Sequence, residues 1–213
     1  MKLSTNFLKD YIDIDVDVKQ LAEDMTRVGN EYDSASNLIN ATKLVIGQIT
    51  ECEPHPDSDH LHLCKVNIGT EVLDIVCGAP NARTGLKVIV ALDGAVLPEK
   101  TIKKGMIRGQ ESNGMLCSIA ELGLEHKFLK PEDSEGIAEL GEDAEIGGDP
   151  IKYLQMDDGV IDFELTANRG DLLSILGMAY EVGAIYDEKV KDVDLKHKES
   201  GEDINLSLIH ISE

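Results

Sequence analysis

The sequence predicts an α+β protein, in which a small closed β-barrel is inserted into a small helical domain formed by both ends of the chain. The apolar residues of the first 41 positions recur at helical spacing, those from Leu44 alternate as in strands, and helical spacing returns after Pro150. With 213 residues and 42% apolar content, the chain is long enough to build hydrophobic cores.

Two short helices are expected at the N-terminus. Ser4 is a suitable N-cap for the first, whose apolar positions run to Ile12. Asp17 is a suitable N-cap for the second, over residues 18–28, and Gly29 is placed to end it. Neither helix can bury its apolar side alone, so both need a partner from elsewhere in the chain.

The middle of the chain is expected to form short strands bounded by glycine and proline. The expected strands span residues 44–49, 61–68, 72–76, 87–92 and 136–140. Five short strands over about 100 residues suit a closed Greek-key barrel such as the oligonucleotide/oligosaccharide-binding (OB) fold. A β-sandwich is the competing architecture.

After the barrel, a strand is expected at residues 160–165 and a helix at 172–186. Either Asn168 or Asp171 is a suitable N-cap for this helix. Its continuous apolar stripe predicts that it packs with the two N-terminal helices. The barrel then becomes an insertion between two halves of one helical unit.

These elements divide the chain into three parts. Residues 1–41 and 151–190 form the discontinuous helical domain, and residues 42–150 form the barrel. Residues 191–213 form a charged linker and then an apolar strand with nothing to pair with, which indicates the truncated start of another domain.

The net charge of −21 argues against a protein that coats nucleic acid indiscriminately. The acidic excess falls mainly on residues 119–213, and residues 42–118 are nearly neutral. One local basic patch lies in this middle part and consists of Lys100, Lys103, Lys104 and Arg108. Such a layout favours docking of a polyanion in one place and repulsion elsewhere.

The cysteines and the hydropathy pattern point to a cytoplasmic protein. The 4 cysteines form no Cys-x-x-Cys pair, so reduced, buried thiols are expected. The sequence has no apolar run of membrane-helix length and no signal-peptide core.

A zinc site is the competing interpretation of one strand. His60, His62 and Cys64 alternate and would project to one face of a strand, as zinc ligands require. No fourth ligand sits at a recognisable spacing, although Cys52 or His55 lies near in sequence. The preferred interpretation is a barrel strand without metal.

Several motifs together resemble the tRNA-binding OB domain of phenylalanyl- and methionyl-tRNA synthetases and of free-standing tRNA-binding proteins. The motifs are VIGQI at 45–49, HPDSDHL at 55–61, IVCGAPN at 75–81, GLKV at 85–88 and IRGQESNGMLCS at 107–118.

The flanks narrow the resemblance. LSTNFLKDY at 3–11 and ELTANRGD at 164–171 are similar to the opening of the bacterial phenylalanyl-tRNA synthetase beta subunit. This family usually has prolines where the chain has Ala167 and Gly170. The resemblance covers about residues 1–190, so the chain is identified as an N-terminal piece of such a subunit. The editing domain would begin further along.

The resemblance implies a part in the ATP- and magnesium-dependent attachment of phenylalanine to tRNA(Phe). The family places the adenylate chemistry in the alpha subunit of a heterotetramer of two alpha and two beta subunits. This part of the beta subunit should therefore have no catalytic residues and no cofactor of its own, and its partners should be tRNA and the alpha subunit, with no DNA and no membrane. The sequence agrees, because it contains neither a phosphate-binding glycine loop nor a nucleophile with an evident base.

Eight residues are the candidates for tRNA binding. The cations of the basic patch can neutralise phosphates. Small polar groups and a further lysine can position phosphate and sugar, although barrel closure explains them equally well. These candidates are Lys100, Lys103, Lys104 and Arg108, followed by Asn81, Lys87, Ser112 and Asn113.

Two other function classes remain open. A free-standing tRNA-binding module or RNA chaperone would need no synthetase-like flanks. An OB domain that docks a protein without touching RNA would agree with the negative net charge.

Overall fold

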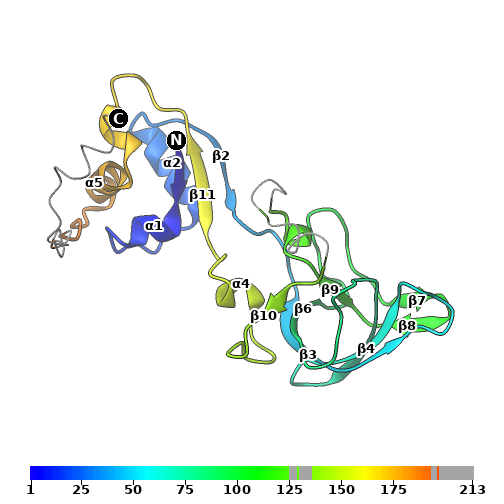
Figure 1. Cartoon of the computed structure of the whole chain (residues 1–213). Helices are drawn as coiled ribbons and strands as arrows, with labels where there is room; N and C mark the ends of the chain where they lie inside the picture. Colours follow the sequence, from blue (N-terminus) through cyan, green and yellow to red (C-terminus); the bar gives the residue numbers. More distant parts are fainter. Residues whose placement is uncertain (125–128, 130–135, 193–195, 197–213) are drawn as a thin grey trace, which may run out of the picture.

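A computed structural model of the chain shows two lobes joined by two chain segments (Figure 1). The structure describes residues 1–124, 129, 136–192 and 196. The two linking segments touch where the backbone N–H of Leu38 donates to the carbonyl of Asp158, 2.7 Å away. One lobe is built from both ends of the described chain and the other from its middle. This is the insertion that the sequence predicts.

The terminal lobe (residues 1–37 and 159–192) combines helices with a small sheet. The sheet is antiparallel, in the order β1-β11-β2. The elements are β1 (Lys2–Ser4), α1 (Thr5–Lys9), α2 (Val18–Arg27), β2 (Tyr32–Asn37), β11 (Gly159–Phe163), the 3₁₀ helix η3 (Gly170–Leu173) and α5 (Ile175–Tyr186). The helical domain of the prediction is therefore a mixed one.

One hydrophobic core holds the terminal lobe together. Leu8 of α1, Met25 of α2 and Val182 of α5 are all fully buried in it, together with Ile161 of β11. The predicted packing of the C-terminal helix on the N-terminal helices is therefore confirmed. Strands β1 and β2 were not predicted, because β2 is an edge strand with a mostly polar sequence and carries little of the apolar signal.

The predicted helix caps are confirmed at two of three positions. The Oγ of Ser4 accepts from the N–H of Phe7, and the carboxylate of Asp17 accepts from the N–H of Lys19. The N-cap of α5, however, is Ser174 and not Asn168 or Asp171. The helix consequently begins three residues later than predicted, because a separate 3₁₀ turn precedes it.

The barrel lobe (residues 44–153) is one antiparallel sheet with a projecting hairpin. Its order is β10-β6-β3-β4-β5, with β9 also paired to β6, and the hairpin is β7-β8. The elements are β3 (Leu44–Pro54), β4 (His62–Asn67), β5 (Val72–Cys77), β6 (Lys87–Ala91), β7 (Gly105–Ile107), β8 (Gln110–Ser112), β9 (Met115–Cys117), the 3₁₀ helix η1 (Ala120–Leu122), β10 (Glu139–Leu140) and α4 (Pro150–Tyr153).

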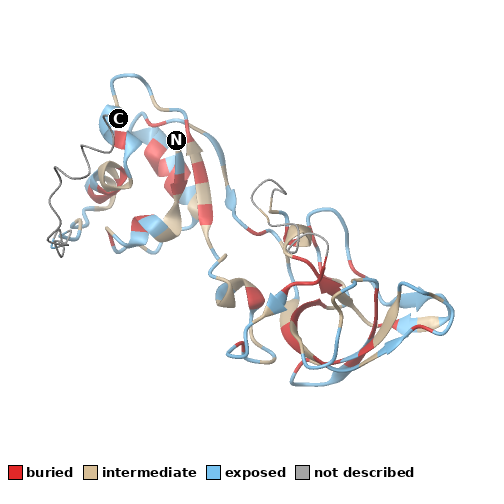
Figure 2. Ribbon diagram, in the orientation of Figure 1, coloured by how far each residue is buried: buried red, intermediate tan, exposed pale blue. Residues whose placement is uncertain are grey.

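The sheet curls around a core that includes Val66, Ile75, Val88 and Leu116, and its buried residues lie on the inner side (Figure 2). Strand β3 is continuous through the bend because its register shifts between Ile49 and Glu51. The α+β class with a curled barrel sheet is confirmed, and a two-layer sandwich is not what forms.

The four predicted strands from residue 44 to residue 92 match β3, β4, β5 and β6. The fifth is shorter than predicted and is limited to β10. Strands β7, β8 and β9 were not predicted, since three-residue strands are too short to show alternation. The strand expected at 205–211 lies outside the described residues. No helix in the described ranges combines the length and apolar character needed to cross a membrane.

Candidate nucleic-acid interface

The basic patch lies on the loop that leads into the β7-β8 hairpin and on the hairpin itself. Lys103 and Lys104 are exposed, and their ammonium groups have no partner among the described residues. The loop is fixed by its backbone, since the N–H of Lys104 donates to the carboxylate of Asp93 at 2.9 Å. Lys100 differs, because its Nζ is 2.7 Å from the Oε1 of Glu121. Two of the three lysines are therefore free to meet an anion.

Arg108 occupies the tip of the β7-β8 hairpin. Arg108 and Gly109 form its two-residue turn with φ angles of 47° and 82°, and a type I′ turn requires positive φ at both positions. One guanidinium nitrogen, Nη1, donates to the carbonyl of Asp57 at 3.2 Å. The hairpin extends beyond the curled sheet (Figure 1), and this hydrogen bond holds its tip against the loop between β3 and β4.

Two apolar side chains accompany these cations. Met106 is 68% exposed and Ile107 is 41% exposed. Because successive residues of a strand point to opposite faces, the hairpin carries one apolar side chain on each face.

The side-chain amide of Asn81, in contrast, makes its hydrogen bonds within the barrel lobe. Its Nδ2 donates to the carbonyl of Ile137 at 2.9 Å and to Glu139 at 3.0 Å, and its Oδ1 accepts from the N–H of Ile137. Arg83 completes the group through a pair of 2.8 Å contacts to Glu139, whose pKa is lowered chiefly by that hydrogen bond. The amide attaches the segment after β5 to the segment before β10.

Lys87 also has a structural partner. Its Nζ donates to the carbonyls of Glu142 and Ala144, at 2.5 and 2.8 Å, and so holds the turn that follows β10.

Ser112 is buried, with 4% exposure, and its hydroxyl is hydrogen-bonded to the backbone groups of Val76 and Gly114. Asn113 is half-buried and attaches to β5 through its backbone, with its N–H donating to the carbonyl of Asp74 at 2.8 Å. The structure thus places Lys103, Lys104 and Arg108 at exposed positions along one loop and hairpin and holds Lys100 in an ion pair. Asn81, Lys87 and Ser112 are hydrogen-bonded within the barrel.

An acidic cleft lies between the hairpin and the outer surface of β3, β4 and β5. This cavity of about 280 Å³ is lined by Glu51, Glu53, Asp74 and Glu111 together with Lys65. Lys65 is paired with Glu51 at 2.8 Å, and this hydrogen bond raises the pKa of Lys65. OB folds commonly bind nucleic acid on this strand face. Here the uncompensated carboxylates would repel a phosphate backbone.

A larger cavity, of about 670 Å³, lies at the other side of the curled sheet. Its lining includes Cys77, Met115 and Ile137, with the Lys100–Glu121 pair also on its wall. The thiol of Cys77 has a lowered pKa because it is hydrogen-bonded to Cys64. The charged residues of its lining are Glu99 and the paired Lys100 and Glu121, so the cavity presents no unpaired cation to a nucleic acid.

The zinc interpretation of His60, His62 and Cys64 finds no geometric support. Cys64 is buried and lies 3.8 Å from the sulfur of Cys52, whereas His60 is exposed in the loop before β4. Within the described ranges, no three His, Cys, Asp or Glu side chains converge in a way that could hold a metal ion.

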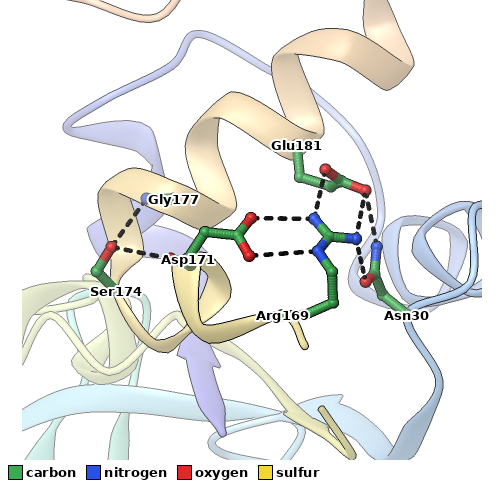
Figure 3. A network of polar contacts seen from close by, with 6 residues as sticks. All are labelled: Asn30, Arg169, Asp171, Ser174, Gly177 and Glu181. Atoms are coloured by element: carbon green, nitrogen blue, oxygen red, sulfur yellow. Dashed lines mark hydrogen bonds and ion pairs between the residues drawn. The ribbon is translucent and has the colours of Figure 1, made fainter. Parts of the chain in front are cut away.

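The terminal lobe carries a polar network centred on Arg169 (Figure 3). Its guanidinium lies 2.8 Å from Glu181 of α5 and 3.1 Å from Asp171, and donates to the amide oxygen of Asn30 at 3.0 Å. Asn30 is 2% exposed and in turn donates to Glu181. The hydrogen bonds from Arg169 lower the pKa of both carboxyl groups. Because these charges are paired with one another, the network joins α2, η3 and α5 and offers no free cation.

Sequence reasoning missed the apolar hairpin tip and the acidic cleft. The hairpin had a weak signal in Arg108-Gly109, a two-residue turn candidate between short segments. The cleft had none, because its four acidic residues come from β3, β5 and the hairpin and converge only in the folded chain.

One protein family matches the barrel lobe of this chain, and individual known proteins match most of its length. Residues 44–149 match the protein family described as "Putative tRNA binding domain". The chain is 47% identical over 192 residues to the phenylalanine–tRNA ligase beta subunit of Lactiplantibacillus plantarum, with 89% of the chain and 24% of that protein covered. The corresponding subunit of Streptococcus pneumoniae is 45% identical over 204 residues, with 95% and 25% covered.

Solved structures resemble about half of the chain. A MetRS related protein from Pyrococcus horikoshii overlaps 49% of the chain and 84% of its own length, with 21% identity and a TM-score of 0.36. The chain spans about a quarter of the length of the curated relatives that it matches.

Proposed function

The chain carries a tRNA-binding domain at residues 44–149 and corresponds to the N-terminal region of phenylalanine–tRNA ligase beta subunits, and from this premise we propose that it positions tRNA for the attachment of phenylalanine. The observation that carries the proposal is the cluster of Lys103, Lys104 and Arg108 on an exposed loop and hairpin. These cations stand out on a molecule whose net charge is −21.

Electrostatics explain how the chain holds RNA in one pose. Each ammonium or guanidinium group that neutralises a phosphate releases condensed counterions, which favours binding at low salt. The acidic cleft excludes the phosphate backbone from the neighbouring strand face. The RNA therefore approaches the loop and the hairpin, and is repelled from the rest of the barrel lobe.

The contacts of the other candidates favour a narrower set of binding residues. Lys103, Lys104 and Arg108 make the phosphate contacts. Lys100 and Asn113 lie at the edge of the proposed RNA-binding surface. The ion pair of Lys100 with Glu121 weakens the attraction of Lys100 for a phosphate. Asn81, Lys87 and Ser112 serve the barrel framework instead.

In the whole enzyme, this part belongs to a larger assembly. The domain division we propose is residues 1–41 with 151–190, residues 42–150, and a segment from 191 that leads to an editing domain. The alpha subunit supplies catalysis with ATP and magnesium, in a heterotetramer of two alpha and two beta subunits. This function implies a cytoplasmic protein.

The test is tRNA binding measured by fluorescence anisotropy over a salt series. The native chain is compared with a variant carrying Lys103→Glu, Lys104→Glu and Arg108→Glu. The control carries Lys19→Glu, Lys152→Glu and Lys189→Glu, which change the same charge at exposed sites elsewhere. We expect the slope of log K against log salt to fall by about one per cation in the first variant and to stay unchanged in the control.

The competing function is protein docking without RNA contact, which the acidic cleft favours. The same measurement separates the two. An absence of tRNA binding by the native chain at low salt would remove the RNA proposal and leave the docking function.

A further inference from the structure

We propose that the tip of the β7-β8 hairpin inserts between unpaired nucleotides of the bound RNA, with Met106 and Ile107 each against a base and Arg108 on the backbone between them. The inference rests on the proposed function and specifies the RNA it takes, which is RNA with an open loop and not a continuous duplex.

The first support is the exposure of the two apolar side chains. Met106 and Ile107 are 68% and 41% exposed, although adjacent apolar residues at the end of a hairpin contribute nothing to the barrel core. Among the described residues, strand β7 pairs with β8 alone, and the exposure of Met106 and Ile107 shows that side chains on both faces of β7 reach solvent. An apolar group on each face gives the hairpin the form of a wedge, a device that proteins use to separate stacked bases.

The second support is the backbone of Arg108. Its φ of 47° lies in the left-handed region, where asparagine or glycine normally stands in a type I′ turn. A strained residue of this kind persists where its side chain serves a function. Among the described residues, the guanidinium makes one hydrogen bond, to Asp57, and so keeps other donors for a ligand.

The third support is the charge around the wedge. Lys103 and Lys104 directly precede β7 and Arg108 is at the tip, so an RNA strand that runs along the hairpin meets cations at both of its ends. Glu111 is the single acidic residue of the hairpin and lies opposite Met106. Because directly opposed residues of two strands project to the same face, Met106 lies on the face that borders the acidic cleft, and Ile107 lies on the opposite face.

The expected ligand is an unpaired nucleotide, because apolar side chains can contact only base faces that are not already stacked. Bases in an A-form helix are stacked, so their faces are available only in loops, bulges and ends. Proteins usually hold such bases on aromatic rings, but the sequence has no Phe, Tyr or Trp between Tyr32 and Phe128. Aliphatic side chains and the guanidinium plane take that role here.

The test compares two labelled RNAs with equal numbers of phosphates, a stem–loop and a blunt duplex, by anisotropy. The native chain is measured beside a Met106→Ser, Ile107→Ser variant. The control is Val72→Ser with Val96→Ser, which removes two other exposed apolar residues of the barrel lobe. Circular dichroism melting curves establish that each variant is folded.

We expect the native chain and the control to bind the stem–loop about tenfold more tightly than the duplex. The hairpin variant should lose that preference and keep its salt slope, because its cations are intact. Equal binding of both RNAs by the native chain, or an undiminished preference in the hairpin variant, overturns the inference and leaves the proposed function standing. Failure of the native chain to bind either RNA removes both.

Discussion

The hydroxyl oxygen of Ser112 lies 3.1 Å from the backbone nitrogen of Val76 and accepts its hydrogen bond. The same hydroxyl donates to the carbonyl of Gly114, also at 3.1 Å. Strand β5 is thereby attached to the segment that enters β9, across a side of the curled sheet where the described residues form no strand ladder. Ser112, one of the candidates for tRNA contact, is thus buried and hydrogen-bonded within the barrel.

Replacement of Ser112 should therefore lower the stability of the barrel lobe and have little direct effect on RNA binding. Ser112→Ala leaves the buried N–H of Val76 without a partner, and we expect the free energy of unfolding to fall by about 1–3 kcal/mol. Urea denaturation measures this. Asn113→Ala is the control, because that side chain has no hydrogen bond to the described residues, and its change should stay within about 0.5 kcal/mol. A stable Ser112→Ala chain with weakened RNA binding would instead return Ser112 to the interface.

The turn at Arg108 predicts opposite changes in stability and binding. Arg108→Asn places the residue that type I′ turns prefer at the left-handed position, so the free energy of unfolding should rise by about 0.5–1 kcal/mol. The same variant loses a cation, so the salt slope for tRNA should fall by about one.

Lys103→Asn provides the comparison for Arg108→Asn. It removes the same charge from a position with no positive φ, so it should lower the salt slope without stabilising the chain. An Arg108→Asn protein that is less stable than the native one would show that the contact to Asp57 outweighs the backbone strain.

The sequence predicted the parts of the fold that repeat a pattern. Residues such as Val88 and Val90 alternate inward along β6, and Leu21 and Met25 lie one helical turn apart on α2, so local spacing identified both elements. Ser174 was missed as a cap because Asp171, an equally good capping residue, precedes it, and only the folded chain shows that Asp171 is taken by Arg169.

The candidate site was predicted less completely than the fold. A run of lysines is visible in the sequence, so Lys103 and Lys104 could be predicted as candidates, and the structure leaves both exposed. The roles of Asn81 and Lys87 depend on carbonyls more than 50 positions away, and no local pattern reports such partners. The exposure of Met106 likewise depends on where the hairpin projects.

The acidic cleft should weaken RNA binding that occurs next to it. Glu53→Gln with Glu111→Gln removes two carboxylates close to the hairpin, so we expect tRNA affinity to rise about two- to fivefold at low salt and the gain to shrink as salt is added. Glu23→Gln with Glu188→Gln changes the net charge equally on the terminal lobe and should have a smaller effect. An equal gain in both variants would mean that net charge alone, and not the cleft, opposes the RNA.

The Arg169 network makes the terminal lobe sensitive to acid. Hydrogen bonds from Arg169 lower the pKa of Glu181 below its value in the unfolded chain, which is about 4.3. The folded state therefore binds its proton less readily than the unfolded state does. The stability from this carboxylate is fully present above the unfolded pKa and is lost as the pH falls through the folded value.

Urea denaturation between pH 7 and pH 3 tests this dependence. We expect the native chain to lose stability below about pH 5. Glu181→Gln should be less stable at pH 7 and lose less on acidification, because its amide does not titrate and pairs less strongly with Arg169. Ser174→Ala is the matched control in the same lobe, because it removes the hydroxyl that caps α5 at the N–H of Gly177. Its free energy of unfolding should fall by about 1 kcal/mol, and this loss should be the same at every pH. A Glu181→Gln chain with the acid dependence of the native protein would assign that dependence to other carboxylates, of which Asp171 on the same guanidinium is the first to examine.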